Sequence, residues 1–364
     1  MTQSGHQSDA HRPVFEAFPA AGLTRYDALS LASGASMRRR EFIKVIAGSA
    51  VAWPLAARAQ QPAMPVVGYL GSETPEKFGI RVTAFQQGLS AMGFDDGRNV
   101  KIEYRWANGQ NERLPALATD LVRRQVAVIA TPGSNASATA AKAATNTIPI
   151  IFETGVDPVA AGLVKSLSRP EGNVTGITSL NVSVAPKRVE LMHELLPKAK
   201  AFAVLVNPAN PTTAEMAVKG SEGPSRALGL QLHFLNASTE HEIESAFAKL
   251  AQLDVGGLIV GADIFFNSRA QQFAALTLKH RVPAVHSVRD FVVAGGLLSY
   301  GGNIGDSHRQ AGIYTGRVLK GEKPANLPVQ QVTKVELTIN LKTAKALGIN
   351  IPNTLIGRAD EVIE

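Results

Sequence analysis

The chain has 364 residues, of which 45% are hydrophobic and 18% are charged, so it can bury a large core, and its length indicates about two domains. Its net charge is +7, but seven basic and four acidic residues precede residue 60, which leaves about +4 for the remainder. The other lysines and arginines are scattered without a basic stripe, so we expect no nucleic-acid partner. The sequence has no cysteine, which excludes disulfides, thiol catalysis and a lipid anchor on an N-terminal cysteine. Apolar runs reach only about ten residues, well short of the roughly 20 that span a bilayer.

The N-terminal segment has the features of an export signal. Residues 37–59 comprise a basic stretch, a short apolar run and an A-x-A cleavage site, and they contain an arginine pair, Arg39-Arg40. The pair resembles the twin-arginine signal, with Arg38 where that signal usually has Ser or Thr. We therefore expect residues 37–59 to be a cleavable signal peptide that directs the protein to the periplasm. Residues 1–36 are expected to be disordered or a wrongly assigned extension, and an amphipathic first helix is the alternative for 37–59.

The body begins with a series of short apolar runs that alternate with amphipathic stretches. After the first run, Val82, Phe85, Leu89 and Met92 recur at helical spacing. Short apolar runs alternating with helices predict a parallel sheet covered on both faces. The expected strands are Pro65–Leu70, Val100–Tyr104, Val126–Ala130, Ile148–Phe152 and Val174–Ile177, and the further helices are Leu114–Arg124, Asn135–Thr145 and Val159–Ser168.

The same order of elements occurs a second time. The expected strands are Phe202–Val206, Leu230–Leu235, Leu258–Val260, Ala284–His286 and Leu297–Tyr300, and the helices are Pro186–Leu196, Thr213–Leu228, Glu240–Leu253, Ser268–His280 and Ser307–Leu319. The sequence thus predicts an α/β protein with two doubly wound, Rossmann-like lobes. Ligands of such sheets bind off the carboxyl ends of the strands, so the cleft between the lobes is the expected site.

Several phrases in fixed order resemble the ABC-transporter substrate-binding family, whose members include tryptophan-binding proteins. They are VVGYL from Val66, FETGVDPVAAGLV from Phe152, GNVTG from Gly172, VNP from Val206, AGGLLSYG from Ala294 and LKGEKP from Leu319. The resemblance implies the type I periplasmic binding fold with hinged lobes, and it implies an importer as partner. It also implies that the chain crosses between the lobes more than once, so that Ser307–Leu319 packs back on the first lobe. We expect lobe 1 to comprise 65–178 plus about 303–328, and lobe 2 to comprise 179–302 plus about 329–364.

Two loops of the first lobe are candidate ligand contacts. Ser134, Asn135 and Ala136 join a strand end to a helix, where free backbone N–H groups and the helix dipole suit a carboxylate. The alternative is that Ser134 only caps its helix. Gly71 and Ser72 follow the first strand, where small residues let a ligand approach the backbone.

Two carboxylates follow the fourth strand of the first lobe. Asp157 precedes Pro158, a pattern typical of a helix N-cap with proline at the first helical position. Glu153 or Asp157 could also receive an ammonium group, as an amino-acid ligand would require. Both roles stay open for Asp157.

In the second lobe, four residues after strands and one at the end of a strand are candidates for orienting the ligand. Asn207, Asp263 and Ser287 are polar, although Asn207 is equally a turn residue before proline. Phe265 offers an aromatic wall or simply packing, and Tyr300 offers a hinge or a ligand contact.

Signals of enzymatic chemistry are sparse. His193 and His241 each begin an H-E-x-x-H pattern, but Pro197 and Ser245 replace the second histidine. The sequence has no nucleophile elbow, phosphate-binding loop or G-x-G-x-x-G after a strand. We therefore expect no enzyme, no cofactor and no metal site.

The function predicted from these observations is capture of a small organic carboxylate or amino acid, bearing an apolar or aromatic group, by closure of the lobes. A monomeric carrier, free in the periplasm without a lipid anchor, would then present the ligand to the membrane permease of an ABC importer. The alternatives are a periplasmic sensing module for a receptor and an exported α/β enzyme.

Overall fold

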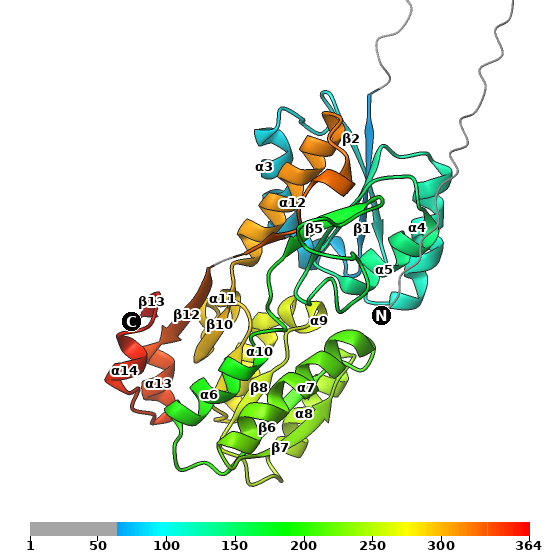
Figure 1. The fold of residues 1–364 in the computed structure, drawn as a ribbon. Coiled ribbons are helices and arrows are strands. Elements are labelled where there is room, and N and C mark those ends of the chain that lie inside the picture. The colour runs from blue at the N-terminus through cyan, green and yellow to red at the C-terminus, as the bar shows by residue number, and fades with distance from the viewer. Residues whose placement is uncertain (1–63, 333) are drawn as a thin grey trace, which may run out of the picture. The chain divides into compact units, whose positions relative to one another are not determined.

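The computed structural model describes residues 64–332 and 334–364, so the expected extension 1–36 and signal peptide 37–59 lie outside the described residues. Within them the chain forms two sheets, each flanked by helices on both faces (Figure 1). This arrangement confirms the prediction of two doubly wound α/β lobes. No helix in this part of the chain combines the length and apolarity needed to cross a membrane.

The first sheet is entirely parallel and has the strand order β11-β5-β4-β3-β1-β2. Its strands are β1 (Val66–Gly71), β2 (Lys101–Trp106), β3 (Val128–Pro132), β4 (Ile150–Thr154), β5 (Val174–Thr178) and β11 (Gln330–Gln331). The helices beside it are α3 (Pro75–Ala91), α4 (Leu114–Arg123), α5 (Asn135–Ala144) and α12 (Ile304–Leu319), with the short turns η1 (Asn111–Arg113) and η2 (Pro324–Asn326).

The second sheet has the order β13-β12-β10-β9-β8-β6-β7, and it departs from the expected parallel sheet because β12 runs antiparallel to β10. Its strands are β6 (Ala201–Val206), β7 (Gln231–Asn236), β8 (Leu258–Val260), β9 (Ala284–His286), β10 (Leu298–Gly302), β12 (Val335–Asn340) and β13 (Glu361–Ile363). Its helices are α6 (Ala185–Leu195), α7 (Pro211–Ala227), α8 (Glu240–Leu250), α9 (Ile264–Asn267), α10 (Ala270–Lys279), α11 (Arg289–Val293), α13 (Leu341–Leu347) and α14 (Asn353–Ile356).

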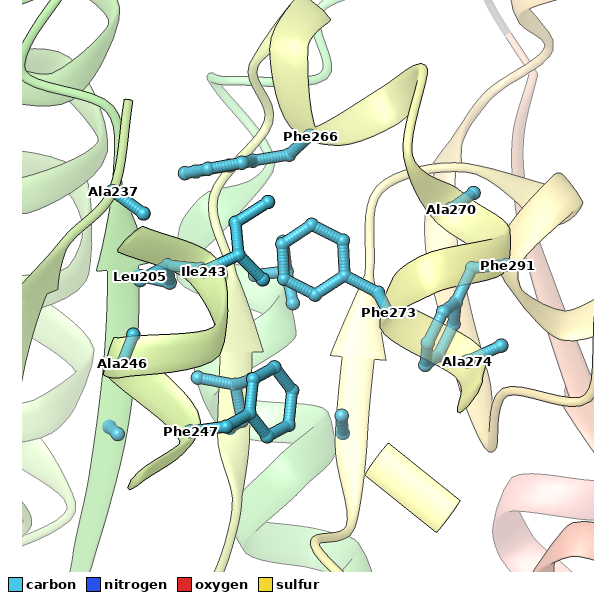
Figure 2. Close-up of a cluster of buried hydrophobic side chains, with 14 of the residues drawn as sticks. Leu205, Ala237, Ile243, Ala246, Phe247, Phe266, Ala270, Phe273, Ala274 and Phe291 are labelled. Carbon is cyan, nitrogen blue, oxygen red and sulfur yellow. The ribbon is translucent and has the colours of Figure 1, made fainter. Parts of the chain in front are cut away.

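Alternation along the central strands supplies a core to each face of a sheet. In β6, Ala203 and Leu205 point into one cluster, whereas Phe202 and Val204 point into the other. Each fully buried phenylalanine or leucine contributes roughly 1.5–3 kcal/mol to folding. Figure 2 shows the first cluster, in which the side chains of Leu205, Ile243, Phe247, Phe266, Phe273 and Phe291 converge.

Helix α12 packs against α3 of the first lobe, as the family resemblance implied. Two glycines permit the contact. A Cβ atom on Gly88 would lie 1.9 Å from the carbonyl oxygen of Arg309, and one on Gly312 would lie 2.0 Å from that of Phe85. Any side chain at either position would therefore push the two helices apart.

Three segments connect the sheets: β5 to α6, β10 to α12, and β11 to β12. Two of them touch, because the amide of Gly302 donates to Asn181 Oδ1 at 2.7 Å. A Cβ atom on Gly302 would also lie 2.8 Å from the carbonyl oxygen of Ser179. Close backbone approach of the connections places their polar groups beside the gap between the sheets.

The predicted helix Val159–Ser168 is wrong, because this segment consists of turns. One helical turn starts after Asp157 and ends at Gly162, whose φ is +69°. The amide of Leu163 donates to the Pro158 carbonyl at 2.8 Å and that of Gly162 donates to Val159 at 2.9 Å. This pair of hydrogen bonds is the Schellman motif that ends helices at a left-handed glycine.

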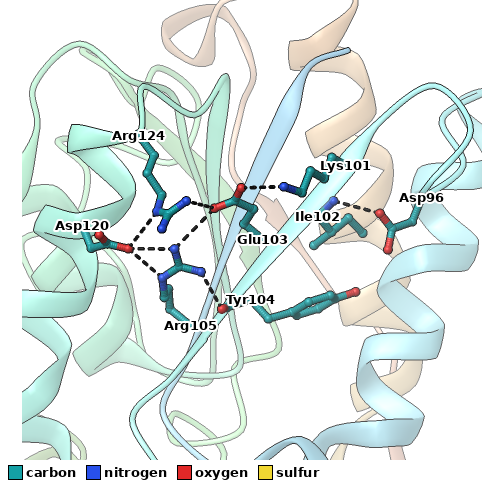
Figure 3. Close-up of polar contacts among 8 residues, drawn as sticks. All are labelled: Asp96, Lys101, Ile102, Glu103, Tyr104, Arg105, Asp120 and Arg124. Atoms are coloured by element: carbon teal, nitrogen blue, oxygen red, sulfur yellow. Dashed lines mark hydrogen bonds and ion pairs between the residues drawn. The ribbon is translucent and has the colours of Figure 1, made fainter.

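Edge strand β2 carries a charged network on the face toward α4 (Figure 3). Glu103 pairs with Lys101 at 3.0 Å and with Arg124 at 3.2 Å, and Arg105 pairs with Asp120 at 2.7 Å. Charges on an edge strand discourage pairing with strands of other molecules. We therefore assign this network to solubility and folding.

Candidate ligand-binding site

A pocket lies between the two sheets, at the carboxyl ends of strands from both. Gly133 and Glu153 line it from β3 and β4, and Asp263 and Asn267 line it from the segment after β8. Asn181 adds a wall from the connection between the sheets.

Three of the residues proposed from the sequence line this pocket, namely Asn135, Glu153 and Asp263. Asn135 begins α5, and its Oδ1 atom is buried without a hydrogen-bond partner among the described residues. An unpartnered buried carbonyl oxygen is costly, so a group on a ligand that donates a hydrogen bond would be stabilised there.

Glu153 is 1% exposed at the end of β4. Its Oε1 atom accepts a hydrogen bond from the hydroxyl of Ser307 at 3.1 Å. Burial raises the pKa of Glu153, although the surrounding hydrogen bonds and the charge of Arg81 oppose this shift. A cation placed beside this carboxylate would be attracted strongly.

Asp263 provides a second buried carboxylate from the opposite sheet. It caps α9 by accepting from the amide of Phe265 at 2.9 Å, and it accepts from the side-chain amides of Asn207 at 2.9 Å and Asn210 at 3.0 Å. Burial raises the pKa of Asp263 as well. Two carboxylates from opposite sheets therefore face one pocket, and three donors fix the orientation of one of them.

Five candidates of the first lobe, Asp157 among them, lie outside the pocket wall. Ser134 caps α5 by accepting from the amide of Ser137 at 3.2 Å, and Ala136 packs against a hydrophobic cluster. Gly71 is covered by Trp106, because a Cβ atom there would lie 2.2 Å from the indole ring. Ser72 is buried, and its hydroxyl has no partner among the described residues.

The remaining candidates have structural contacts. Asp157 accepts from the amides of Val159 and Ala160, as an N-cap does, while Asn207 orients Asp263. Phe265 belongs to a hydrophobic cluster. The hydroxyl of Ser287 donates to Asn267 Oδ1 at 2.9 Å, and the carbonyl of Tyr300 accepts from Arg188 Nη1 at 3.0 Å.

Sequence reasoning missed Arg81 on α3. This arginine is 6% exposed, its guanidinium lies 5.2 Å from the centroid of the Phe78 ring, and its Nη1 atom has no hydrogen-bond partner among the described residues. Burial lowers its pKa, and the charges of Asp290 and Glu153 oppose the shift. A buried guanidinium with an unused donor is a natural partner for a carboxylate. Its signal in the sequence was a charge three residues after Phe78, on the apolar face of the helix.

Two polar residues of the pocket wall were also missed. Asn181 Nδ2 is a buried donor without a hydrogen-bond partner among the described residues. His308 Nε2 is a buried ring nitrogen that also has no hydrogen-bond partner among them. No pattern in the sequence distinguishes them from ordinary polar residues. Within residues 64–332 and 334–364, no group of three or more His, Cys, Asp or Glu side chains could hold a metal.

Ion pairs connect the two sides of the gap near the pocket. Arg269, between α9 and α10, contacts Glu73 of the first lobe at 3.0 Å and Glu240 of its own lobe at 3.1 Å. Lys77 of α3 reaches the same Glu240 carboxylate at 3.5 Å. The lobes are thus held in a closed arrangement in which both contribute to one pocket.

Two Rossmann-like lobes with a polar pocket between them define the class of two-lobed solute-binding proteins. The family profile of the ABC transporter substrate binding protein matches residues 78–363, and the chain belongs to this family. Proteins of this family bind small molecules, interact with ABC permeases and are typically periplasmic or extracellular. They are binding proteins rather than enzymes.

Individual relatives agree with this assignment. A tyrosine-binding protein of Clostridioides difficile is 32% identical over 267 residues, which cover 72% of this chain and 75% of the relative. The solved structure of an ABC domain in complex with L-Trp from Streptococcus pneumoniae is 26% identical, with a TM-score of 0.72 over 83% of this chain and 100% of that one. A conserved domain protein from Vibrio cholerae, also 26% identical, has a TM-score of 0.74 over 82% of this chain and 99% of that one.

Proposed function

We propose that this protein captures a free amino acid with an aromatic or large apolar side chain and delivers it to the permease of an ABC importer. The observation that carries the proposal is the charge pattern around the pocket. Two buried carboxylates, Glu153 and Asp263, lie on its wall. Arg81 provides a buried guanidinium with an unused donor, and its charge acts on Glu153. An amino acid has one ammonium and one carboxylate, which complement groups of both signs. The relatives that bind L-Trp or tyrosine support this class of ligand.

In this proposal, the ligand carboxylate binds on the side of Arg81 and α5. The first amides of α5 have no acceptor within the helix, and the helix dipole favours an anion there. Ser134 orders this turn through its capping hydrogen bond, and Asn135 lines the pocket beside it. Of the three candidates in this turn, Asn135 lines the pocket, and the proposed carboxylate site combines it with Arg81.

The ligand ammonium binds beside Glu153 and Asp263. Because these carboxylates come from opposite sheets, a ligand that contacts both stabilises the closed arrangement over an open one. Asn207 acts through Asp263 by fixing its orientation. Val156, Val182 and Ile264 supply apolar wall for the side chain of the ligand.

Closure around the ligand has a functional consequence. The closed, liganded form differs from an open form in the relative placement of both lobes, so a permease that contacts both lobes can select it. We propose that the protein acts as a monomer in the periplasm, after export by the signal in residues 37–59, and that it catalyses no reaction.

A thermal-shift screen tests the function. The full-length protein, unfolded and refolded to remove carried ligand, is mixed with L-tryptophan, L-tyrosine, L-phenylalanine, L-leucine, D-glucose or myo-inositol. A ligand that binds only the native state raises the melting temperature with its concentration. We expect saturable shifts with aromatic amino acids, whereas a shift with the sugars alone would contradict the proposal.

A further inference from the structure

His308 lies on α12, is fully buried and lines the pocket. Its Nδ1 atom is 2.9 Å from the carbonyl oxygen of Ile304. A carbonyl oxygen only accepts hydrogen bonds, so Nδ1 carries the ring hydrogen. Burial, followed by the charge of Arg81, lowers the pKa of His308 to about 3, and the ring is neutral at physiological pH. The other nitrogen, Nε2, is therefore an acceptor with a free lone pair.

The surroundings of Nε2 are apolar on two sides. The point where a Cβ atom of Gly133 would stand is 3.2 Å from Nε2, 3.2 Å from a methyl carbon of Ile264 and 3.4 Å from the ring edge of Phe78. Gly133 has φ of +93°, a conformation that L side chains rarely adopt, so no side chain stands between these three groups. The surroundings of Nε2 thus combine this acceptor atom with hydrocarbon from Ile264 and Phe78.

This combination suits a neutral donor on an aromatic ring better than it suits an ammonium group. An ammonium is better stabilised beside the carboxylates of Glu153 and Asp263, and the positive charge of Arg81 near His308 disfavours a second cation there. Glu153 Oε2 lies 3.9 Å from Nδ1, the nitrogen that already donates to Ile304. Without a donor, Nε2 remains a buried acceptor that has lost its hydrogen bond to water.

We propose that His308 Nε2 accepts a hydrogen bond from the ring of the ligand, and that it thereby selects aromatic amino acids with a ring N–H or O–H group over L-phenylalanine. This inference rests on the proposed function and adds a specificity-determining residue to it. An unsatisfied buried acceptor costs about 1–3 kcal/mol, which corresponds to roughly 5- to 150-fold in affinity.

The test is isothermal titration of the full-length, refolded protein with two matched pairs of ligands. L-Tyrosine and L-phenylalanine differ by a phenol O–H, and L-tryptophan and 3-benzothienyl-L-alanine differ by replacement of the indole N–H with sulfur. The variants are His308→Phe, which removes the acceptor, and His308→Gln, which offers an amide oxygen in its place. Thr315→Val, two turns further along α12, controls for packing because its buried hydroxyl bonds only to the Ala311 carbonyl.

We expect the wild type to bind the ring-donor member of at least one pair roughly 10- to 100-fold more tightly than its partner. This ratio should fall to within about threefold of unity in His308→Phe, and it should be retained in Thr315→Val and partly restored in His308→Gln. Equal affinities within both pairs for the wild type, or an affinity ratio that His308→Phe leaves unchanged, would overturn the role of His308 without contradicting the proposed function. If the wild type binds none of the four ligands, the proposed function fails, and the inference fails with it.

Discussion

Replacing Arg269 with glutamine tests whether the interlobe ion pair supports ligand binding. Arg269 Nη1 is 3.0 Å from Glu73 Oε2, and the two side chains are 10% and 3% exposed. The guanidinium also lies 3.8 Å from the centroid of the Phe265 ring. Glutamine keeps a polar end group, but it is shorter than arginine and carries no charge.

The expected loss of ligand affinity depends on the burial of Glu73 in the closed form. Loss of one partner of a buried ion pair costs about 3–5 kcal/mol when the other charge stays buried. Burial already raises the pKa of Glu73 although Arg269 lies beside it, so this carboxyl can escape part of the cost by taking up a proton. A remaining penalty of about 2–3 kcal/mol falls on the closed form and weakens ligand affinity roughly 30- to 150-fold.

Isothermal titration with L-tyrosine measures this effect in Arg269→Gln, with Glu240→Gln as the control. Glu240 also contacts Arg269, but its side chain is 54% exposed, and an exposed ion pair contributes at most about 1 kcal/mol. The control should therefore bind within about fivefold of the wild type. An affinity of Arg269→Gln within twofold of the wild type would refute the reasoning.

Three other predictions follow from the packing and electrostatics. In titrations, Arg81→Gln should weaken binding of L-tyrosine at least about tenfold. Tyramine lacks a carboxylate, so its weaker binding should be nearly unchanged. Equal losses of affinity for both ligands would contradict the role of Arg81. Affinity for L-tyrosine should fall on acidification, by up to about tenfold per pH unit for each proton taken up, because Glu153 and Asp263 have raised pKa values and bind protons above the usual carboxyl range. A flat affinity between pH 7.5 and 5 would exclude this linkage. In thermal unfolding, Gly88→Ala should destabilise the protein by about 1–3 kcal/mol through the close contact with Arg309. Gly79→Ala on the same helix should be neutral or stabilising, because a Cβ atom there would have no atom within 4 Å. Similar effects of both substitutions on stability would argue against the helix contact.

Local pattern predicted the central strands well because their apolar runs are short and clearly bounded. β8 and β9 begin and end where the sequence pattern placed them, at Leu258–Val260 and Ala284–His286. The segment after Pro158 failed because Gly162 ends its single turn, and a glycine four residues into an apolar stretch was the signal against a longer helix. The C-terminal strand β12 was missed because its partner β10 is distant in sequence and pairs antiparallel.

The site was predicted in part, since parallel sheets direct ligands to their carboxyl ends. Glu153 lies at the end of β4 and Asp263 follows β8, and the rule therefore selected them. Arg81 and His308 sit on α3 and α12, two helices that pack together although their segments are more than 200 residues apart. The pairing of Glu73 with Arg269 likewise joins residues 196 positions apart, which no local pattern reveals.

The most direct test of the proposed function is whether the pocket binds both charged groups of an amino acid. Titrations of the refolded full-length protein with L-tyrosine, tyramine and 3-(4-hydroxyphenyl)propionate compare the complete ligand with analogues that lack the carboxylate or the ammonium. We predict that L-tyrosine binds at least about tenfold more tightly than either analogue, because each loses its partner at Arg81 or at Glu153 and Asp263. Binding of either analogue as tightly as L-tyrosine would contradict the assignment of the pocket as an amino-acid site.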